Sequence, residues 1–219
     1  MVTSPQGHAD HMDGIYRYQR YFYDATRKFY LLGRDRMVAG LQPPDGGRLL
    51  EVGCGTGRNL IVAAQRYRHA TFHGFDISRM MLETARANVE KAGLSGRITL
   101  AQGDASAFSA QELFGVPAFE RVYISYAVSM IPPWKPAVGQ AFAAVKSGGS
   151  LHIVDFGQQG ELPGWFRAGL RGWLARFSVE PRAELEAELT ALAQRTGASL
   201  KFEHLYRDYS HLAVLTKPS

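Results

Sequence analysis

Residues 49–59 read LLEVGCGTGRN, and this stretch decides the fold. Its apolar start is typical of a buried strand, and the glycines after it let the backbone turn tightly into a helix and approach a ligand without a Cβ in the way. The spacing Gly-x-Gly-x-Gly differs from the Gly-x-Gly-x-x-Gly of dinucleotide-binding dehydrogenases, and Glu51 just before the loop would repel a pyrophosphate. The stretch therefore predicts a strand, a loop and a helix that favour a cationic ligand.

Strand and helix patterns alternate from Arg48 onward, which is typical of α/β proteins with a parallel sheet and helical crossovers. Strands are predicted at 48–52, 71–75, 97–102, 121–125, 150–155, 199–206 and 210–216, and helices at 59–67, 78–92, 110–114, 135–145 and 180–195. The short turn at 207–209 forces the last two strands to pair antiparallel. We expect a Rossmann-like, seven-stranded, mostly parallel sheet with an antiparallel C-terminal hairpin.

Two acidic residues follow the next two predicted strands: Asp76 ends the motif GFD, and Asp104 lies in QGDA. The carboxyl ends of parallel strands meet at one edge of an open α/β sheet, where ligands bind, so we expect the glycine loop, Asp76 and Asp104 to line one crevice. The alternative is a Rossmann-type sheet with ordinary turn glycines and solvent-facing acids. Cys54 is interpreted as a small filler of the loop, since no base is evident beside it.

Over about residues 48–155, the motifs EVGCGTG, GFD and QGDA resemble those of the class I S-adenosylmethionine-dependent methyltransferases. The resemblance implies that fold, S-adenosylmethionine as cofactor and S-adenosylhomocysteine as product. In that family the glycine loop passes under the amino-acid part of the cofactor, the first acid holds the ribose hydroxyls and the second binds the adenine amine; an Arg fork suits the cofactor carboxylate. The expected cofactor-binding residues are Tyr30, Arg34, Glu51, Gly53, Gly55, Gly57, Asp76, Ile77, Asp104, Ala105 and Ser125.

The fourth predicted strand ends in Ser125-Tyr126-Ala127, where the methyl group should face its acceptor. Nucleic-acid amino-methyltransferases carry Asp or Asn, two prolines and an aromatic residue at that place. Here IPPW, residues 131–134, comes several residues too late and begins with Ile, so it is interpreted as the entry to the next helix. The sequence therefore disfavours a nucleic-acid partner, and strongly salt-dependent RNA binding would reopen that alternative.

Residues 15–36 are rich in aromatic side chains and Arg, and their spacing predicts a helix that Gly33 breaks before a second short helix. Class I methyltransferases of this size commonly use such an extension as a lid over the cofactor. We therefore expect a helical lid at 1–41 and a methyltransferase domain at 42–219, with an insertion at 158–181 that faces the substrate or lipid.

The segments YRYQR, residues 16–20, and YDATRKFYLLGRDR, residues 23–36, resemble the BtaB N-methyltransferases of bacterial betaine-lipid synthesis. That family methylates the amine of diacylglyceryl-homoserine three times. The resemblance implies a lipid substrate with an amino headgroup and, as a partner, the enzyme that makes the homoserine lipid. Residues 23–36 are also similar to ubiquinone and menaquinone methyltransferases, so phosphatidylethanolamine or a quinone precursor stays open as acceptor. Aromatic faces hold an ammonium product, and the expected catalytic residues are Tyr16, Tyr18, Tyr23 and Tyr126.

Residues 162–177, LPGWFRAGLRGWLARF, mix bulky apolar residues with Arg and contain no acid. A helix here places bulky residues on one face and Arg side chains outward, and these are Phe166, Leu170, Trp173, Leu174 and Phe177, and Arg167, Arg171 and Arg176. This profile fits an interfacial helix on an anionic membrane and fits equally a cover over the substrate cleft.

The composition, 46% hydrophobic and 21% charged over 219 residues, excludes disorder and coiled coil. A single cysteine excludes an intrachain disulfide and a cysteine-based zinc cluster, no histidine has the context of a ligand, and we expect no metal in the site. No apolar run approaches the ~20 residues of a membrane span, and residues 1–13 lack signal-peptide features. With a net charge of +5, we expect a cytoplasmic protein peripherally bound to the inner face of the membrane. A catalytically silent cofactor-binding module is the alternative from another class.

Overall fold

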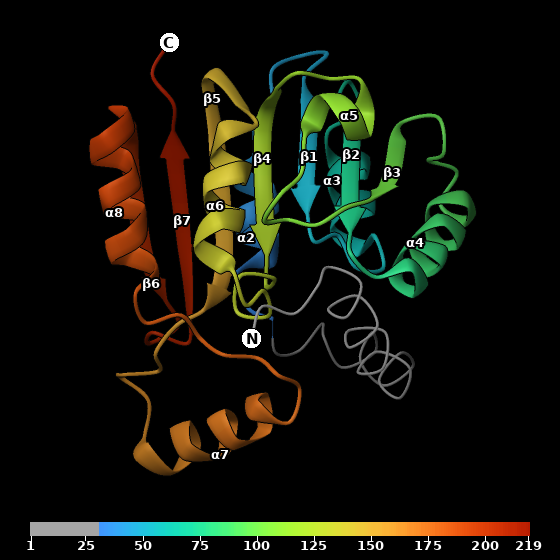
Figure 1. Cartoon of the computed structure of the whole chain (residues 1–219). Helices are drawn as coiled ribbons and strands as arrows, with labels where there is room; N and C mark the ends of the chain where they lie inside the picture. Colours follow the sequence, from blue (N-terminus) through green and yellow to red (C-terminus); the bar gives the residue numbers. More distant parts are fainter. Residues whose placement is uncertain (1–30) are drawn as a thin grey trace.

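The structure, a computed structural model, describes residues 31–219 as one seven-stranded sheet flanked by helices (Figure 1). In spatial order the strands are β3 (Ile98–Gln102), β2 (Thr71–Asp76), β1 (Arg48–Val52), β4 (Phe119–Ser125), β5 (Val145–Phe156), β7 (Ser210–Thr216) and β6 (Ser199–Leu205). The five strands from β3 to β5 are parallel, whereas β7 pairs antiparallel with both β5 and β6. The predicted seven-stranded α/β fold with its antiparallel C-terminal hairpin is confirmed.

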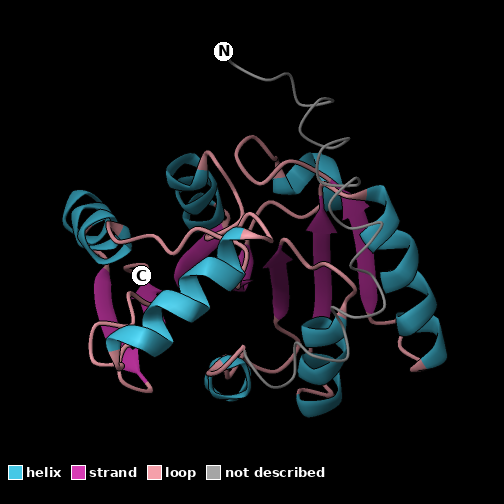
Figure 2. Cartoon of the chain, turned by 90° about the horizontal axis from the view of Figure 1, so that it is seen from below, coloured by secondary structure: helices cyan, strands magenta, loops and turns pink. Residues whose placement is uncertain are grey.

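Helices cover both faces of the sheet, as parallel strands buried on both sides require (Figure 2). One apolar core lies under α2 (Arg34–Gly40), α3 (Arg58–Arg66) and α4 (Arg79–Lys91). The other lies under α5 (Ala110–Phe114), α6 (Trp134–Ala143) and α8 (Leu185–Thr196). The remaining helix, α7 (Gly164–Ala175), lies beyond the carboxyl ends of the parallel strands (Figure 1). It thus lies at the edge where the predicted crevice is expected.

The strand β5 is longer than predicted and begins at Val145, a residue that the sequence assigned to the preceding helix. Val145 pairs with Phe119, and the register then shifts before Ser150 pairs with Arg121. The four residues between, KSGG, bulge out of the ladder, and Gly148 there adopts φ +70°. Because this stretch lacks the alternation of apolar and polar residues that marks a strand, the sequence pattern could not reveal it.

The helix predicted at 180–195 begins five residues later, at Leu185. Pro181 disfavours helical backbone at Glu180, and the Glu180 N–H donates instead to the Ser129 carbonyl at 2.9 Å. The guanidinium of Arg182 donates to the carbonyls of Val128 and Ile131. This segment therefore packs on the loop after β4 instead of forming a first helical turn. In the same region of the sheet, β6 ends at Leu205, so that Tyr206 belongs to the turn and not to the strand.

The predicted second short helix is confirmed, because α2 begins directly after Gly33. Gly33 has φ +88°, and a Cβ there would meet the side chains of Leu205 and Val154 at 3.0 and 3.2 Å. The expected lid helix before it lies outside the described residues. No helix among residues 31–219 is long and apolar enough to cross a bilayer.

Candidate functional site

The glycine loop after β1 turns against the end of β2. The N–H groups of Gly53 and Cys54 both donate to the Phe75 carbonyl, at 3.0 and 2.9 Å. The φ angles of Gly53, Gly55 and Gly57 are +71°, +52° and +77°, which residues other than glycine rarely adopt. A Cβ on Gly53 would lie 2.9 Å from the Cβ of Ala127. The loop is therefore held in a tight bend, and its backbone faces the space beyond the carboxyl ends of the parallel strands.

The Asp76 carboxylate fixes this bend from the neighbouring strand. Its Oδ2 accepts a hydrogen bond from the Gly55 N–H at 2.8 Å, and its Oδ1 accepts one from the Ser78 N–H at 2.9 Å. Ser78 in turn caps α4, because its hydroxyl accepts from the Met81 N–H. One side chain thus connects the glycine loop to the start of the next helix.

Asp104 holds the loop after β3. Its Oδ1 accepts from the N–H and the hydroxyl of Ser106, at 2.8 and 2.7 Å. The N–H of Gly103 donates to the Asp76 carbonyl at 3.1 Å, which brings the ends of β2 and β3 together. The two predicted acids therefore lie at the same edge of the sheet.

Glu51 is a buried carboxyl at the base of the site, only 1% exposed. Burial raises its pKa from 4.5 to about 8, although the amide of Asn59, which donates to Oε1 at 2.8 Å, and the nearby charge of Arg34 act to lower it. At neutral pH this carboxyl is mostly protonated and neutral. A bound cation would favour its ionised form.

A pocket joins these groups at the carboxyl ends of the parallel strands. Ten of the predicted residues line it, and these are Arg34, Glu51, Gly53, Gly55, Asp76, Ile77, Asp104, Ala105, Ser125 and Tyr126. Gly57 does not line the pocket; it forms the N-cap of α3, and a Cβ there would meet Ala85. Tyr16, Tyr18, Tyr23 and Tyr30 lie outside the described residues.

The sequence missed part of the pocket wall, which includes Asn59, Met81, Met130, Ile131 and Pro133. Asn59 carried a usable signal, because it lies in the first turn of the helix directly after the glycine loop, where it donates to Glu51. Met130 and Ile131 lie in a loop without periodicity, so no pattern could assign them. Together with Leu31 they add apolar side chains to the pocket wall.

Tyr126 also lines the pocket, and its φ angle is +54°. Its hydroxyl donates to the Leu32 carbonyl at 2.5 Å, and its ring packs edge-on against Phe156. Burial, followed by the nearby charge of Asp155, raises its pKa well above the ordinary value. The phenol therefore stays protonated and holds the chain at Leu32, and it does not act as a proton acceptor.

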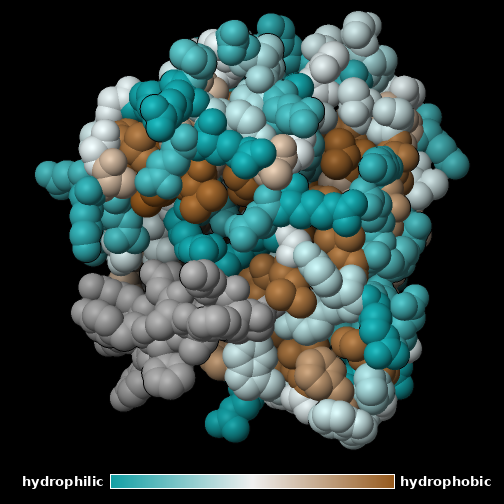
Figure 3. Space-filling view, turned by 180° about the vertical axis from the view of Figure 1, so that it is seen from behind, coloured by the Kyte–Doolittle hydropathy of each residue, from teal (hydrophilic) through white to brown (hydrophobic). Residues whose placement is uncertain are grey.

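A second, apolar groove lies beside the pocket under α7. It is lined by Leu32, Leu162, Phe166, Leu170, Trp173, Tyr206 and Tyr209. Leu31 lines the pocket and the next residue, Leu32, lines the groove, so the two spaces are neighbours. Seen from behind, hydrophobic residues lie at the lower right, where α7 lies, and also across the upper half of the molecule (Figure 3).

The helix expected within residues 162–177 is confirmed as α7, and most of it is exposed. Trp165 is 78% exposed, whereas Trp173 packs against Phe177 with ring centroids 4.8 Å apart. Arg171 is exposed, as expected, but it is not free in solvent. Its guanidinium donates to the carbonyl and the side-chain oxygen of Gln158, at 3.1 and 2.9 Å, and ties α7 to the segment after β5.

Comparison with known proteins bears on this site. Residues 49–149 match the family described as Methyltransferase domain. The chain is 30% identical over 130 residues to the ubiquinone/menaquinone biosynthesis C-methyltransferase of Allorhizobium ampelinum, which is 57% of this chain and 48% of that protein. The match thus spans about half the length of that relative. The chain is also 32% identical over 152 residues to the phosphatidylethanolamine N-methyltransferase of Cereibacter sphaeroides, 64% of this chain and 71% of that protein.

Among solved structures, the phosphoethanolamine N-methyltransferase 2 of Haemonchus contortus in complex with S-adenosyl-L-methionine has a TM-score of 0.71. The match covers 100% of this chain and 61% of that one, at 18% identity. At this identity the likeness shows the fold alone. It agrees with the α/β fold described above.

Proposed function

The chain belongs to the class I S-adenosylmethionine-dependent methyltransferases, and from this premise we propose that it methylates the amino headgroup of a lipid. S-Adenosylmethionine is the cofactor and the reaction is methyl transfer. The acceptor is the open question. The apolar groove directly beside the cofactor pocket carries the proposal, because it offers a lipid chain a surface next to the reacting groups.

In this proposal different pocket residues bind the methionine, ribose and adenine parts of the cofactor. The backbone of Gly53 and Gly55 lies under the methionine part, near Glu51 and Arg34, which suit its ammonium and carboxylate groups. Asp76 holds the ribose hydroxyls. Asp104, with Ala105 beside it, takes the adenine. The methyl group would then point toward Tyr126.

Methyl transfer to an amine depends more on holding the amine in line with the methyl group than on acid–base catalysis. The amine first loses its proton to water, and its lone pair then attacks the methyl carbon while the S–C bond breaks and S-adenosylhomocysteine leaves. The described pocket wall includes the apolar side chains of Met130 and Ile131, and the positive charge of Arg34 acts on the phenol of Tyr126. An environment of this kind favours the neutral amine over its ammonium form. The expected role of Tyr16, Tyr18 and Tyr23 in holding the product cation remains a proposal.

The finer proposal is that the acceptor is diacylglyceryl-homoserine, which would become the trimethyl betaine lipid. It rests on the resemblance of residues 16–36, and the phosphatidylethanolamine N-methyltransferase relative supports an amino lipid in general. The second candidate is C-methylation of a quinone precursor. The ubiquinone/menaquinone C-methyltransferase relative favours it, and a polyprenyl tail would fit the same groove.

Methyl-labelled cofactor and a panel of acceptors in mixed micelles would test the proposal. The panel holds diacylglyceryl-homoserine, phosphatidylethanolamine and a demethylated quinol, and products are identified by mass spectrometry. We expect label on the nitrogen of an amino lipid, with mono-, di- and trimethyl products in order. Label on quinol carbon alone would favour the second candidate, and the absence of transfer to every acceptor would favour a silent cofactor-binding module.

We further propose that the protein binds anionic membranes peripherally through α7, and we expect Trp165→Ala to weaken vesicle binding at least about tenfold. An indole that leaves the membrane interface loses apolar burial of roughly 1.5–3 kcal/mol. Arg176, exposed at the end of this helix, contributes charge, and Arg176→Ala should weaken binding to anionic vesicles only. Sedimentation with phosphatidylglycerol and phosphatidylcholine vesicles measures both effects.

The matched control for Arg176→Ala is Arg195→Ala, which removes another exposed charge, on α8, where Arg195 pairs with Glu188. It should leave vesicle binding and cofactor affinity unchanged. If Trp165→Ala sediments like the parent protein, α7 is a cover for the groove and not a membrane anchor.

A further inference from the structure

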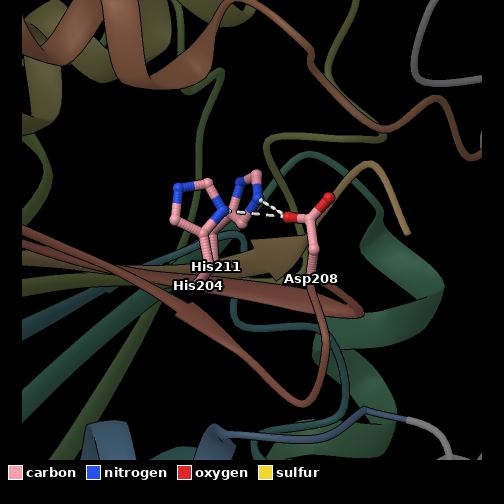
Figure 4. Close-up of side chains that lie close together, drawn as sticks. All are labelled: His204, Asp208 and His211. Carbon is pink, nitrogen blue, oxygen red and sulfur yellow. Dashed lines mark hydrogen bonds and ion pairs between the residues drawn. The ribbon is translucent and has the colours of Figure 1, made fainter. Parts of the chain in front are cut away.

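Two histidines and an aspartate meet at the β6–β7 turn, away from the cofactor pocket (Figure 4). His204 and His211 are direct cross-strand partners, and Asp208 lies in the turn between them. His204 Nδ1 lies 3.0 Å and His211 Nε2 lies 2.6 Å from Asp208 Oδ1. Figure 4 shows both rings turning a nitrogen toward this carboxylate. One ligand atom from each residue lies within 4.8 Å of the others.

The backbone of the turn is shaped to hold Asp208 in this position. Tyr206, Arg207 and Asp208 have φ angles of +54°, +58° and +61°, a left-handed run that is unfavourable for residues with a Cβ. Such strain persists only where surrounding contacts fix it, and it is concentrated at functional sites. Here the segment after β5 supplies contacts, because Gly160 N–H donates to Asp208 Oδ2 at 2.9 Å and Gln159 N–H donates to its carbonyl at 2.8 Å.

We propose that His204, Asp208 and His211 bind a divalent transition-metal ion, for which Zn²⁺ is the natural probe. Ligands that each lie about 2 Å from a zinc ion are about 3 Å from one another, close to the spacing found here between the imidazole nitrogens and the carboxylate. Two imidazoles and one carboxylate are a ligand set that suits such ions. On binding, the ion replaces the proton that His204 or His211 shares with Asp208, and that proton is released to water.

The surroundings of the cluster fit a bound ion. The side chain of His204 is 49% exposed, whereas that of His211 is 6% exposed, so one side of the cluster is open to water that can complete the coordination. On the other nitrogen of His204, the Glu186 carboxylate of α8 lies at 3.4 Å. A carboxylate behind a ligating imidazole is the usual outer contact of a metal-bound histidine.

The ion would fasten three segments that are far apart in the sequence: the β6–β7 turn, the segment after β5 and the start of α8. Tyr206 and Tyr209 of this turn also line the apolar groove. Tyr209 packs on Phe156, which packs on Tyr126 of the cofactor pocket. The metal would therefore be structural and would fix one wall of the groove, with no contact to the methyl group.

Metal binding by the full chain, freed of any affinity tag and of bound metal, tests the proposal. We expect one equivalent of Zn²⁺ in competition with a chromophoric chelator, visible d–d absorption with Co²⁺, and a higher Tm with Zn²⁺. His204→Gln and His211→Gln should each weaken Zn²⁺ binding more than about 100-fold, and Glu186→Gln about 10-fold. The control His69→Gln, at an exposed histidine elsewhere, should still bind one equivalent.

The parent protein and His69→Gln are expected to bind Zn²⁺ on their own account, so the test still works if His204→Gln or His211→Gln fails to fold. If neither binds Zn²⁺ more tightly than His204→Gln does, the proposal is wrong. The same holds if Zn²⁺ leaves the Tm of the parent unchanged. The cluster is then a hydrogen-bonded tie that holds the turn without an ion.

Discussion

Asp76→Ala is expected to weaken S-adenosylmethionine binding at least about 100-fold, or roughly 3 kcal/mol. The variant loses the carboxylate that accepts the Gly55 and Ser78 N–H groups, so the glycine loop is no longer held in its bend. It also loses the proposed bonds to the ribose hydroxyls. Hydrogen bonds to a charged group contribute about 1.5–3 kcal/mol each, and two of them account for the expected loss. Titration calorimetry of the purified variant measures it.

Asp45→Ala is the matched control, since it removes an exposed carboxylate of the same type. It should bind the cofactor like the parent protein. To separate loop positioning from direct contact with the ribose, the affinities of 5′-methylthioadenosine and its 2′-deoxy analogue can be measured for the parent protein and for Asp76→Ala. The parent should prefer the ribose compound, and Asp76→Ala should not discriminate between the two. Equal affinity of the parent and Asp76→Ala for the full cofactor would remove Asp76 from the site.

The arrangement of the sheet could be predicted because its strands carry strong local signals. The run before Gly53 is apolar and short, and the turn at 207–209 leaves the last two strands no choice but to pair antiparallel. The bulge before Ser150 could not be predicted, because pairing with Phe119 decides it. Pro181 is a local signal against a helix that begins at Glu180, but the packing of this segment on the loop after β4 could not be predicted. Those contacts join residues far apart in the sequence.

The candidate site divides in the same way. Gly53, Asp76 and Asp104 follow strand ends, and because parallel strands end at one edge of a sheet, their place in the sequence is enough to predict that they meet. The high pKa of Glu51 could not be foreseen, because it comes from burial. The meeting of His204 with His211 depends on strand register, and Asp208 joins them only through a left-handed turn. No local pattern in the sequence marks either feature.

Cofactor binding is expected to strengthen as the pH rises from 6 to 8, by up to about 100-fold, and to level off above pH 8. Glu51 in the free protein has a pKa of about 8, so below that pH it is protonated. The cofactor carries a sulfonium and an ammonium group, and these charges favour the carboxylate. Binding must then release the proton, and each pH unit below 8 costs up to about tenfold in affinity until the pKa in the complex is reached.

Without cofactor, the folding stability should fall as the pH rises, whereas the affinity for the cofactor rises. The pKa of Glu51 is raised from 4.5 to about 8 in the folded chain, so the folded state binds more protons between these values. The contribution of Glu51 to stability is fully present below pH 4.5 and is lost as the pH rises to about 8. The increase in Tm that the cofactor produces should therefore grow over the same range.

Glu51→Gln isolates this carboxyl, because the amide imitates its protonated form. At pH 6 the variant should bind the cofactor much as the parent does, and at pH 8.5 about 100-fold more weakly. Calorimetry in buffers of different ionisation enthalpy should count about one proton released by the parent near pH 6.5 and less by the variant. Any titration of the cofactor's own amino group occurs with both proteins and cancels in the comparison. Glu112→Gln, at an exposed position, should show the same dependence of cofactor affinity on pH as the parent protein. If the affinity of the parent protein stays constant from pH 6 to 8.5, Glu51 does not face the charge of the cofactor.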